Sequence, residues 1–384
     1  MTANRAYLDH NASAPLLPAA REAMIAALDL TANPSSVHFE GREARRLVET
    51  ARRDVAALCG AKPEHVVFTS GASEATALVL TPDWKMGRAP LTYSRLYVAE
   101  TDHSIVVGGG RFGPEQVVAL PVAETGTLDL DALAGALAAH DGSQGLPLVA
   151  IHLANNETGA LQPAARIASI VHEAGGLFVL DAVQGGGRVS LDITELCADF
   201  LILAAHKIGG PKGAGALVGT SDVLMPSPIA SGGGQERGHR AGTENYAAIA
   251  GFGAAAREAL ANLARASLLE GKRARIEGLI RQVVPDATIF AEAVDRLPNT
   301  VFFAIPGVKA ETALIAFDLA GVSVSAGSAC SSGKVGASRV LKAMGYGETV
   351  SGLRVSVGHQ TTDAEIDRFA AALNEFMHRR SNAA

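Results

Sequence analysis

The sequence predicts an α/β protein in which a mostly parallel sheet is covered by helices, followed by a smaller α+β unit. Up to Gly219, short apolar stretches of strand type alternate with helical stretches, as in sheets with helices on both faces. Beyond Gly219 the alternation gives way to a Gly-rich polar loop and a long helical region. The length of 384 residues is sufficient for a large domain and a smaller companion.

The first part of the chain is expected to be helical and the next part to form the sheet. Leu16–Leu30 has helical spacing and is stopped by Asn33-Pro34, and Gly41–Cys59 is an amphipathic helix that ends at Gly60. The strands expected after it are Val66–Thr69, Leu96–Ala99, Gln116–Leu120, Leu148–His152, Leu177–Asp181, Phe200–Leu203 and Ala216–Gly219. Helices are expected between most of them, for example at Asp129–Ala139 and Ala164–Ala174.

The remainder predicts a second unit. Thr243–Val283 is mostly helical with an interruption near Gly271. After it, the expected strands are Val301–Ala304, Val322–Ser325 and Arg354–Val357, and the expected helices are Lys309–Leu319, Ser338–Met344 and Asp363–Arg379. We expect a large domain over residues 16–258, and a small domain formed by residues 1–15 and 259–384.

The composition excludes several classes of protein. A hydrophobic content of 48% argues against disorder, and a net charge of −6 argues against nucleic acid as the main partner. No apolar run reaches the roughly 18 residues of a membrane span, and the N-terminus lacks the apolar stretch of a signal peptide. We therefore expect a cytoplasmic protein with no membrane partner.

The chain has three cysteines, Cys59, Cys197 and Cys330, and no CxxC pair, so neither a disulfide framework nor a metal site is expected. Cys59 closes an amphipathic helix and Cys197 precedes a strand, so both are interpreted as core residues. Cys330 lies in a run of Ser, Gly and Ala, with few side chains to bury it. A reactive thiol and an ordinary Cys in a substrate-binding or turn segment both fit that placement.

One candidate motif is Val66–Ala77 (VVFTSGASEATA), in which an apolar strand runs through Gly71 into a helix. The backbone N–H groups and the positive end of the helix dipole make such a turn a phosphate-binding site. An ordinary strand-to-helix turn has the same composition, so the motif alone leaves both interpretations open.

A second candidate is Asp181, which ends the apolar strand Leu177–Asp181 and is followed by Gln184. Ligands of open α/β sheets bind beyond the carboxyl ends of the strands. A carboxylate buried there needs a cationic partner. A helix cap or a structural ion pair would explain Asp181 equally well.

A third candidate is His206-Lys207, delivered by the strand Phe200–Leu203 and followed by a Gly-Gly-Pro turn. A Lys held at a strand end against apolar walls is easily desolvated, which lowers its pKa and favours Schiff-base chemistry. A solvated Lys in a Gly-rich loop is the alternative. Lys212, after the Pro, is interpreted as solvated.

Together these three motifs match what pyridoxal 5′-phosphate needs: an amine for the Schiff base, a helix N-terminus for the phosphate, and a carboxylate for the pyridine nitrogen. His103, which follows the strand Leu96–Ala99, is a candidate to cover the ring, or else a surface histidine.

At this point the sequence resembles a known family. The motifs that carry the resemblance are Asn33-Pro34-Ser35-Ser36 with His38, the TSGASE turn, Asn155–Gly159, Asp181–Gln184, His206-Lys207 with GGPKG, Arg240–Thr243 and Ser325–Ser331 (SAGSACS). Together they resemble the NifS-like cysteine desulfurases, in the class V branch of the fold-type I pyridoxal phosphate enzymes. The resemblance runs from Tyr7-Leu8-Asp9 to Arg354 and its strand, and the segment around Cys330 is its most specific part.

The resemblance implies a role for each matching residue. Lys207 would carry the cofactor as a Schiff base, and Cys330 would be the nucleophile. The other implied cofactor contacts are Asp181 at the ring nitrogen, Gln184 and Asn156 near the ring oxygen, His103 on the ring, and Ala72, Ser73 and His206 at the phosphate. Thr243 would reach the phosphate from the partner subunit of a homodimer. Arg354, with Asn33 and Asn156 nearby, would bind the substrate carboxylate.

The implied reaction converts L-cysteine to L-alanine. Lys207 would act as base at Cα, His103 would move protons between the substrate thiol and the ring, and Cys330 would take the sulfur as a persulfide. The sulfur would then pass to an acceptor protein, for iron–sulfur cluster assembly or thiolation.

Two departures from the family pattern affect these expectations. Many relatives have a Ser two residues before the His of the His-Lys pair, where this chain has Ala204, and a lost hydrogen bond to the phosphate would weaken cofactor binding. The chain also stops at Ala384, soon after the last expected helix, so the partners of relatives with longer tails need not be shared.

Two other functions compete with a cysteine desulfurase. One is a selenocysteine lyase, or a class V aminotransferase or lyase acting on another amino acid. The other is a non-enzymatic binding or sulfur-relay protein on the same fold. Lys207, Asp181 and His103 argue against the non-enzymatic function, and Cys330 favours the desulfurase.

Overall fold

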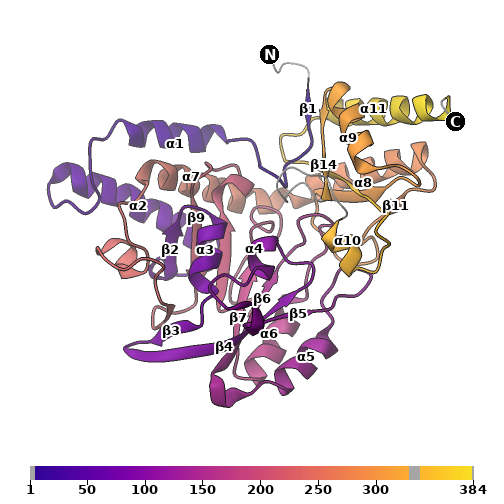
Figure 1. Ribbon diagram of the computed structural model, residues 1–384. Coiled ribbons are helices and arrows are strands. Elements are labelled where there is room, and N and C mark those ends of the chain that lie inside the picture. Colours follow the sequence, from indigo (N-terminus) through magenta and orange to yellow (C-terminus); the bar gives the residue numbers. More distant parts are fainter. Residues whose placement is uncertain (1–4, 328–337, 383–384) are drawn as a thin grey trace.

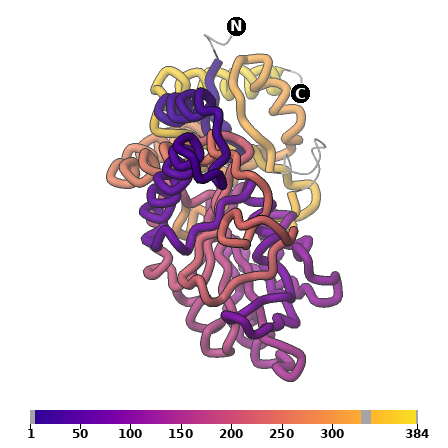
Figure 2. Tube along the Cα trace, turned by 90° about the vertical axis from the view of Figure 1, so that its left-hand side faces the viewer, coloured from indigo at the N-terminus to yellow at the C-terminus, as the bar shows by residue number. Residues whose placement is uncertain are grey.

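The computed structural model describes residues 5–327 and 338–382 of the chain. Figure 1 shows a large sheet with helices around it, and the orange and yellow C-terminal part gathered to one side of it at the upper right. In the perpendicular view of Figure 2, the N-terminal end of the chain again lies beside the C-terminal part. The two ends of the sequence therefore meet in one region of the molecule.

The large sheet has nine strands in the order β10-β3-β4-β6-β7-β8-β9-β2, and β5 also pairs with β4. The strands are β2 (Val66–Thr69), β3 (Asp83–Met86), β4 (Ala89–Ala99), β5 (Val117–Leu120), β6 (Leu146–His152), β7 (Leu177–Asp181), β8 (Phe200–Ala204), β9 (Gly215–Gly219) and β10 (Leu224–Pro226). Pairing is parallel from β4 to β8 and antiparallel at the β3–β10 and β9–β2 edges. The predicted α/β fold is confirmed, with parallel pairing confined to the central strands.

Helices cover both faces of this sheet, as strand alternation requires. They are α1 (Pro18–Leu28), α2 (Phe39–Leu58), α3 (Ala72–Val79), α4 (Ser104–Val107), α5 (Leu130–Ala138), α6 (Ala164–Glu173) and α7 (Tyr246–Asn262). Tyr97 and Ala99 of β4 pack in one cluster with α2, α5, α6 and α7. Leu96 and Val98, on the opposite face, pack with α3 and α4.

The strand β4 begins much earlier than the stretch Leu96–Ala99 that the sequence predicts. Its first half forms an antiparallel hairpin with β3, closed by Gly87 at φ 60°. Pro90 and several exposed polar side chains in this hairpin hide the alternation that identifies a strand. Trp84, which is fully buried, anchors it by packing on Tyr93 and Phe200.

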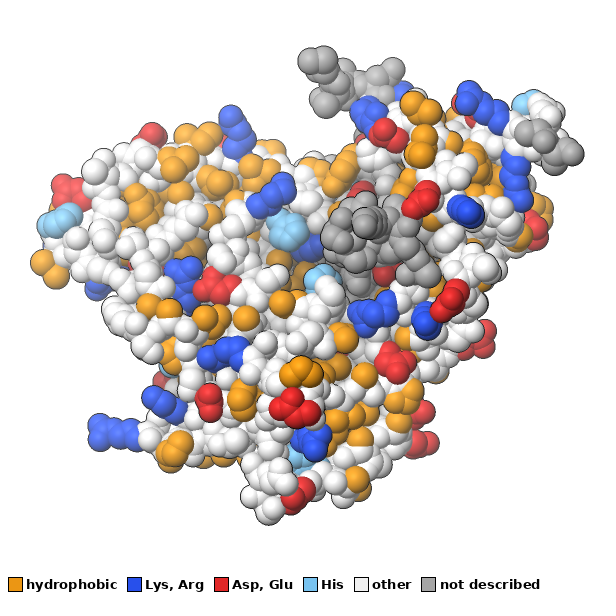
Figure 3. All heavy atoms as spheres, in the orientation of Figure 1, with side chains coloured by type: hydrophobic (Ala, Val, Ile, Leu, Met, Phe, Trp, Pro, Cys, Tyr) orange, Lys and Arg blue, Asp and Glu red, His pale blue; other side chains and the backbone are white. Residues whose placement is uncertain are grey.

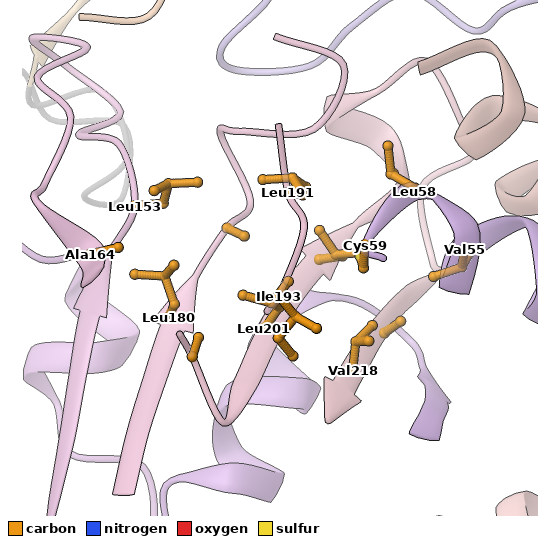
Figure 4. Packing of buried hydrophobic residues seen from close by; sticks show 14 of the residues in the cluster. Val55, Leu58, Cys59, Leu153, Ala164, Leu180, Leu191, Ile193, Leu201 and Val218 are labelled. Carbon is orange, nitrogen blue, oxygen red and sulfur yellow. The ribbon is translucent and has the colours of Figure 1, made fainter. Parts of the chain in front are cut away.

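Cys59 and Cys197 differ in burial, although both were expected in the core. Cys59 is buried among Val55, Leu58 and other apolar side chains, and burial raises its pKa to about 12 (Figure 4). Cys197 is exposed, in a turn at φ 54°. The interpretation of Cys197 as a core residue is therefore wrong, because the turn before β8 directs this position to solvent.

The C-terminal unit has its own sheet and core. A four-stranded antiparallel sheet has the order β11 (Thr288–Ile289), β12 (Thr300–Ala304), β15 (Leu353–Ser356) and β14 (Ser325–Ala326), and β1 (Ala6–Tyr7) pairs in parallel with β13 (Val322–Ser323). The helices are α8 (Ala266–Val283), α9 (Ala310–Leu319), α10 (Arg339–Ala343) and α11 (Asp363–Ser381). Ala6 and Leu8 lie in the same apolar cluster as Phe303, Phe317 and Phe369.

The long helical region is interrupted at η6 (Leu263–Arg265), a 3₁₀ turn between α7 and α8. The expected interruption near Gly271 is wrong, because Gly271 lies inside α8 with open space around it. Ala259 packs in the cluster of the large sheet, and Leu269 packs in the cluster of the C-terminal sheet. The domain division at residues 258 and 259 remains a prediction.

A buried ion pair connects the Gly-rich loop, Ser231–Arg240, to the large sheet. Arg52 of α2 donates to both carboxylate oxygens of Glu236 at 2.7 and 2.9 Å, and the backbone N–H of Phe68 in β2 donates to the same carboxylate. Both side chains are almost fully buried. The loop that carries Thr243 is therefore fixed at Glu236.

We expect Glu236→Gln to lower the free energy of unfolding by about 3–5 kcal/mol, because Arg52 would lose its buried partner and keep only the ion pair of its Nε with the more exposed Glu49. Urea unfolding followed by circular dichroism measures this. The control is Glu43→Gln, which removes an exposed ion pair with Arg46 and should leave the unfolding midpoint unchanged. Equal stability of Glu236→Gln and the parent protein would contradict the role given to this pair.

Candidate active site

A cavity of about 560 Å³ lies at the edge of the large sheet where the central parallel strands end. It is bounded by β6, β7 and β8, by the start of α3, and by the N-terminal segment. The predicted cofactor residues that line it are Ala72, Ser73, His103, Asn156, Asp181, Gln184, His206 and Lys207. The sequence-predicted cofactor site is thus brought together, apart from Thr243.

The strand ends explain why these residues meet. His152 ends β6 and pairs in register with Asp181, which ends β7. The strand β8 ends at Ala204, and the 3₁₀ turn η4 (Ala205–Lys207) follows it directly. Because the carboxyl ends of parallel strands lie at one edge of a sheet, Asp181 and Lys207 face the same cavity.

The start of α3 forms one end of the cavity. Its N-cap is Gly71, which offers no capping side chain, so the first N–H groups have no partner within the helix. Gly215 of β9 lies directly against it: a Cβ atom there would be 2.5 Å from the carbonyl carbon of Gly71. A glycine is therefore required at position 215 for the sheet to approach the turn so closely.

Asp181 is a half-buried carboxylate, and no ion pair of its side chain is seen among residues 5–327 and 338–382. Its Oδ1 accepts a hydrogen bond from the backbone N–H of Val183 at 3.1 Å. Burial raises the pKa of Asp181, partly offset by that hydrogen bond and by the nearby His103. A positively charged nitrogen placed in the cavity would supply the ionic partner of this carboxylate.

The amine of Lys207 is held by the N-terminal segment. Its Nζ donates to the backbone carbonyl of Asn11 at 2.7 Å and to that of Ala12 at 3.0 Å. Neither carbonyl carries a charge. The amine is thus directed by neutral acceptors at the mouth of the cavity.

His103 is the N-cap of the short helix α4, where its Nδ1 accepts a hydrogen bond from the backbone N–H of Ile105 at 3.3 Å. Burial lowers its pKa, so the imidazole is neutral at pH 7. Since Nδ1 accepts, the ring proton is on Nε2.

Two polar groups beside these residues were missed by sequence reasoning. Asp102, fully buried, accepts from the backbone N–H groups of Ala99 and His152 at 2.6 and 2.7 Å, and pairs with His152 Nδ1 at 2.5 Å. The Nε2 atom of Gln162 lies 3.1 Å from Nε2, the other ring nitrogen of His152. This network fixes the ends of β4 and β6 on either side of His103. His152, a histidine at the end of an apolar strand, was the feature of the sequence that could have revealed this network.

Asn11 was also missed, because the polar N-terminal run served only to exclude a signal peptide. It lines the cavity, is 1% exposed, and its backbone carbonyl accepts from Lys207 and, at 3.0 Å, from Gln184 Nε2. Gln184 is oriented on its other side by Arg188, which donates to its Oε1 at 2.6 Å. The amide oxygen of Gln184 and one N–H of its amide nitrogen are therefore engaged, which leaves its second N–H.

Arg354 lies behind the cavity wall and does not line it. The guanidinium is 2% exposed, with Nη2 on Asp9 at 2.6 Å and Nη1 on the carbonyl of Asn156 at 2.8 Å. Its Nε is buried without a hydrogen-bond partner among residues 5–327 and 338–382. The Nε donor of this guanidinium is thus unsatisfied, although Arg354 does not line the cavity.

Two other predicted residues lie elsewhere. Asn33 and Thr243 are exposed on loops and do not line the cavity of this chain. Cys330 lies outside the described residues.

No described helix is long and apolar enough to cross a membrane. Within the same residues, His, Cys, Asp and Glu side chains form no cluster of three or more that could hold a metal ion.

Comparisons with known proteins show the family of this chain. The family model for class-V aminotransferases matches residues 6–369. A cysteine desulfurase of Cereibacter sphaeroides is 39% identical, with 96% of this chain and 95% of that protein aligned. An IscS-like cysteine desulfurase of Mycobacterium tuberculosis is 35% identical, with 99% and 98% aligned. The chain belongs to the cysteine desulfurases of the class-V aminotransferase family.

Solved structures of this family share the fold. The NifS-like protein of Rickettsia africae superposes with a TM-score of 0.88 at 33% identity, covering 98% of this chain and 100% of that one. Class-V family members are pyridoxal-phosphate-dependent enzymes, and the residues of this cavity fit that cofactor: uncapped N–H groups suit a phosphate, and the buried Asp181 suits a ring nitrogen.

The N-terminal segment that holds Lys207 also carries a buried histidine. Burial, and to a smaller extent Arg188, lowers the pKa of His10 to about 4, although Glu365 acts in the opposite direction. His10 is therefore neutral in the folded protein, whereas in the unfolded chain it takes up a proton near pH 6.5. Its contribution to stability is complete above pH 6.5 and is lost as the pH falls towards 4.

We expect the free energy of unfolding to fall between pH 7 and pH 5, with about 2 kcal/mol of the decrease due to His10. Urea unfolding of the parent protein and of His10→Gln at both pH values measures this share as the difference in pH dependence. The same pH dependence in both proteins would show that His10 is not buried as a neutral group.

Proposed function

We propose that this chain is a pyridoxal-phosphate-dependent cysteine desulfurase. It would convert L-cysteine to L-alanine and hold the sulfur as a persulfide on Cys330, for transfer to an acceptor protein in iron–sulfur cluster assembly or thiolation. The observation that carries the proposal is one cavity lined by Lys207, Asp181 and His103, in a chain whose relatives at 35–39% identity are cysteine desulfurases.

The cavity residues divide between the parts of the cofactor. The first turn of α3, at Ala72 and Ser73, and His206 would hold the phosphate, and Asp181 would bind the ring nitrogen. The remaining contacts would be Lys207 as the point of attachment, His103 on the ring face, and Gln184 and Asn156 near the ring oxygen. When bound, pyridoxal phosphate draws electrons from the substrate and makes its Cα–H bond acidic.

Lys207 and His103 would move the protons. The Nζ of Lys207, directed by the carbonyls of Asn11 and Ala12, takes the proton from the substrate Cα and later returns a proton to the product. His103, neutral and with its proton on Nε2, exchanges that proton with the substrate sulfur. Asp181 stays ionised when it faces a protonated ring nitrogen.

Arg354 would bind the substrate carboxylate, with Asn33 and Asn156 nearby. The buried Nε without a hydrogen-bond partner supports this, since such a donor is costly unless a ligand satisfies it. Asp9 and the carbonyl of Asn156 hold the two Nη atoms and fix the plane of the guanidinium.

The sulfur transfer balances without another reactant. The Cys330 thiolate attacks the substrate sulfur, so that an S–S bond forms as the Cβ–S bond breaks. The electron pair of the broken bond goes to the substrate carbon, which is protonated to give L-alanine. One cysteine and one enzyme thiol thus become one alanine and one enzyme persulfide.

We expect incubation with L-cysteine to add the mass of one sulfur to Cys330 and to no other residue. Peptide mass spectrometry locates the added sulfur. Cys330→Ser should release no sulfide yet keep the visible absorbance of the bound cofactor, whereas the control Cys197→Ser, which alters an exposed free thiol, should react as the parent does. Added sulfur on all three cysteines or on none, or full turnover of another amino acid by Cys330→Ser, would overturn the proposal.

The active site would be completed in a homodimer. Thr243, on the loop anchored by Glu236, does not line the cavity of its own chain. Large apolar side chains are exposed on and around α1 and the start of α2, among them Leu28, Val37 and Phe39, and hydrophobic side chains are visible over α1 in Figure 3. Both observations support a second copy that covers these helices and supplies its Thr243.

A mixture of two inactive or weakened variants tests this arrangement. In a hybrid of Lys207→Ala and Thr243→Ala subunits, one site would contain an intact Lys207 and the intact Thr243 of the other subunit. We expect activity at limiting cofactor to rise when the two variants are refolded together, compared with either alone. No rise, with hybrids demonstrated by mass spectrometry, would place Thr243 in its own subunit's site.

We further infer that the enzyme works in the cytoplasm, with no nucleic acid or membrane partner. Cys59 and Cys197 are both free thiols, as expected in a reducing compartment. In Figure 3, Lys and Arg side chains are interspersed with Asp and Glu, without a continuous basic surface on the face shown.

A further inference from the structure

The charges at the α3 end of the cavity do not balance a phosphate. A phosphate monoester carries between about −1.5 and −2 charges at pH 7. The helix end and the N–H groups of its first turn supply partial positive charge only. Binding a dianion there therefore calls for at least one full cation.

The ionised groups nearest to α3 cancel each other. Glu74 lines the cavity, but its carboxylate is paired with Arg240 at 2.9 Å and accepts from the backbone N–H of Ser70 at 2.7 Å. The positive charge of Arg240 is thus used by Glu74.

His206, which also lines the cavity, is uncharged. Burial, with the positive charges of Lys207 and Lys212, lowers the pKa of His206 to about 4. Before an anion binds, His206 is therefore neutral at pH 7 and can offer a hydrogen bond but no full charge. Ala204, which also lines the cavity, has no polar side chain at all.

Lys212 is the remaining cation of the cavity lining besides Lys207. The turn that carries it is anchored on both sides, since Gly210 N–H donates to the carbonyl of Ala205 at 2.9 Å and Ala205 N–H donates to that of Ala214 at 3.1 Å. No hydrogen bond or ion pair of its ammonium is seen with the described residues, although it is close enough to His206 to affect its titration.

We propose that Lys212 is the counter-charge for the phosphate of the cofactor. This assignment rests on the proposed function, because it presupposes pyridoxal phosphate with Lys207 used for the covalent link. Lys212 was expected to be solvated; in the structure it is exposed and also forms part of the cavity wall. The positive charge would come from the turn after η4, whereas Ala204, at the end of β8, offers the phosphate no hydrogen bond.

The test compares two ligands that differ only in the phosphate. Dissociation constants of pyridoxal 5′-phosphate and of pyridoxal are measured by absorbance on the apoprotein of the parent and of Lys212→Met. We expect Lys212→Met to weaken pyridoxal 5′-phosphate binding about tenfold, equal to about 1.4 kcal/mol, and to leave pyridoxal binding unchanged. Lys212→Arg should keep most of the affinity, and Lys85→Met, an exposed lysine on β3 outside the cavity, should have no effect.

Salt gives a second measurement. The affinity of the parent for pyridoxal 5′-phosphate should fall more steeply with sodium chloride concentration than that of Lys212→Met, because a partly exposed ion pair is screened. Equal weakening of both ligands, or of neither, would overturn the role of Lys212 while the proposed function stands. Failure of the parent apoprotein to bind pyridoxal 5′-phosphate at all would instead overturn the proposed function.

Discussion

The active site depends on the hydrogen bonds of one buried residue, Asn11. These bonds join the C-terminal sheet to the large unit that carries Lys207. The backbone N–H of Asn11 donates to Ser356 Oγ at 3.0 Å, and its Nδ2 donates to Thr300 Oγ1 at 2.9 Å, both in the C-terminal sheet. Its carbonyl accepts from Lys207 and Gln184, both in the large unit. The position of the reactive amine is therefore set by a residue that is itself fixed by the other sheet.

Buried polar groups around the cavity follow one rule: each charge is met by a partner, or is left open on the side of the proposed ligand. Asp102 is saturated by two backbone N–H groups and His152, and it stiffens the wall of the cavity. Asp181 and Arg354, by contrast, are each partly unsatisfied. The difference separates residues that shape the site from residues that would bind cofactor and substrate.

The sequence was sufficient to predict those site residues that follow strand ends. Asp181, Lys207 and the start of α3 could be predicted because the carboxyl ends of parallel strands converge, whatever the details of packing. Asn11 could not, because its partners are far away in the sequence and no local pattern describes them. Arg354 was predicted from resemblance, but its pairing with Asp9 depends on how the segment after β1 lies beside the end of β15.

Similar reasons explain what was predicted of the fold. Helices and central strands with regular apolar spacing were placed well, since burial on a sheet dictates the pattern. The β3–β4 hairpin was missed because several of its side chains are polar and exposed and because it contains Pro90. The position of the break between α7 and α8 was also missed, since glycine at position 271 marks a weak point that the structure does not use. Cys197 was misplaced because the turn before β8, rather than the strand, decides its exposure.

The contacts of Asn11 also have a consequence for the order of folding. Asn11 and Ser356 are separated by 345 positions, so this link closes almost the largest loop that the chain can form. During synthesis, the backbone N–H of Asn11 lacks its partner Ser356 until β15 has emerged. Contacts of such high sequence separation form late, so the large sheet can assemble with Lys207 in place before the amine acquires its acceptors. Maturation of the active site is then a docking event that involves both ends of the chain.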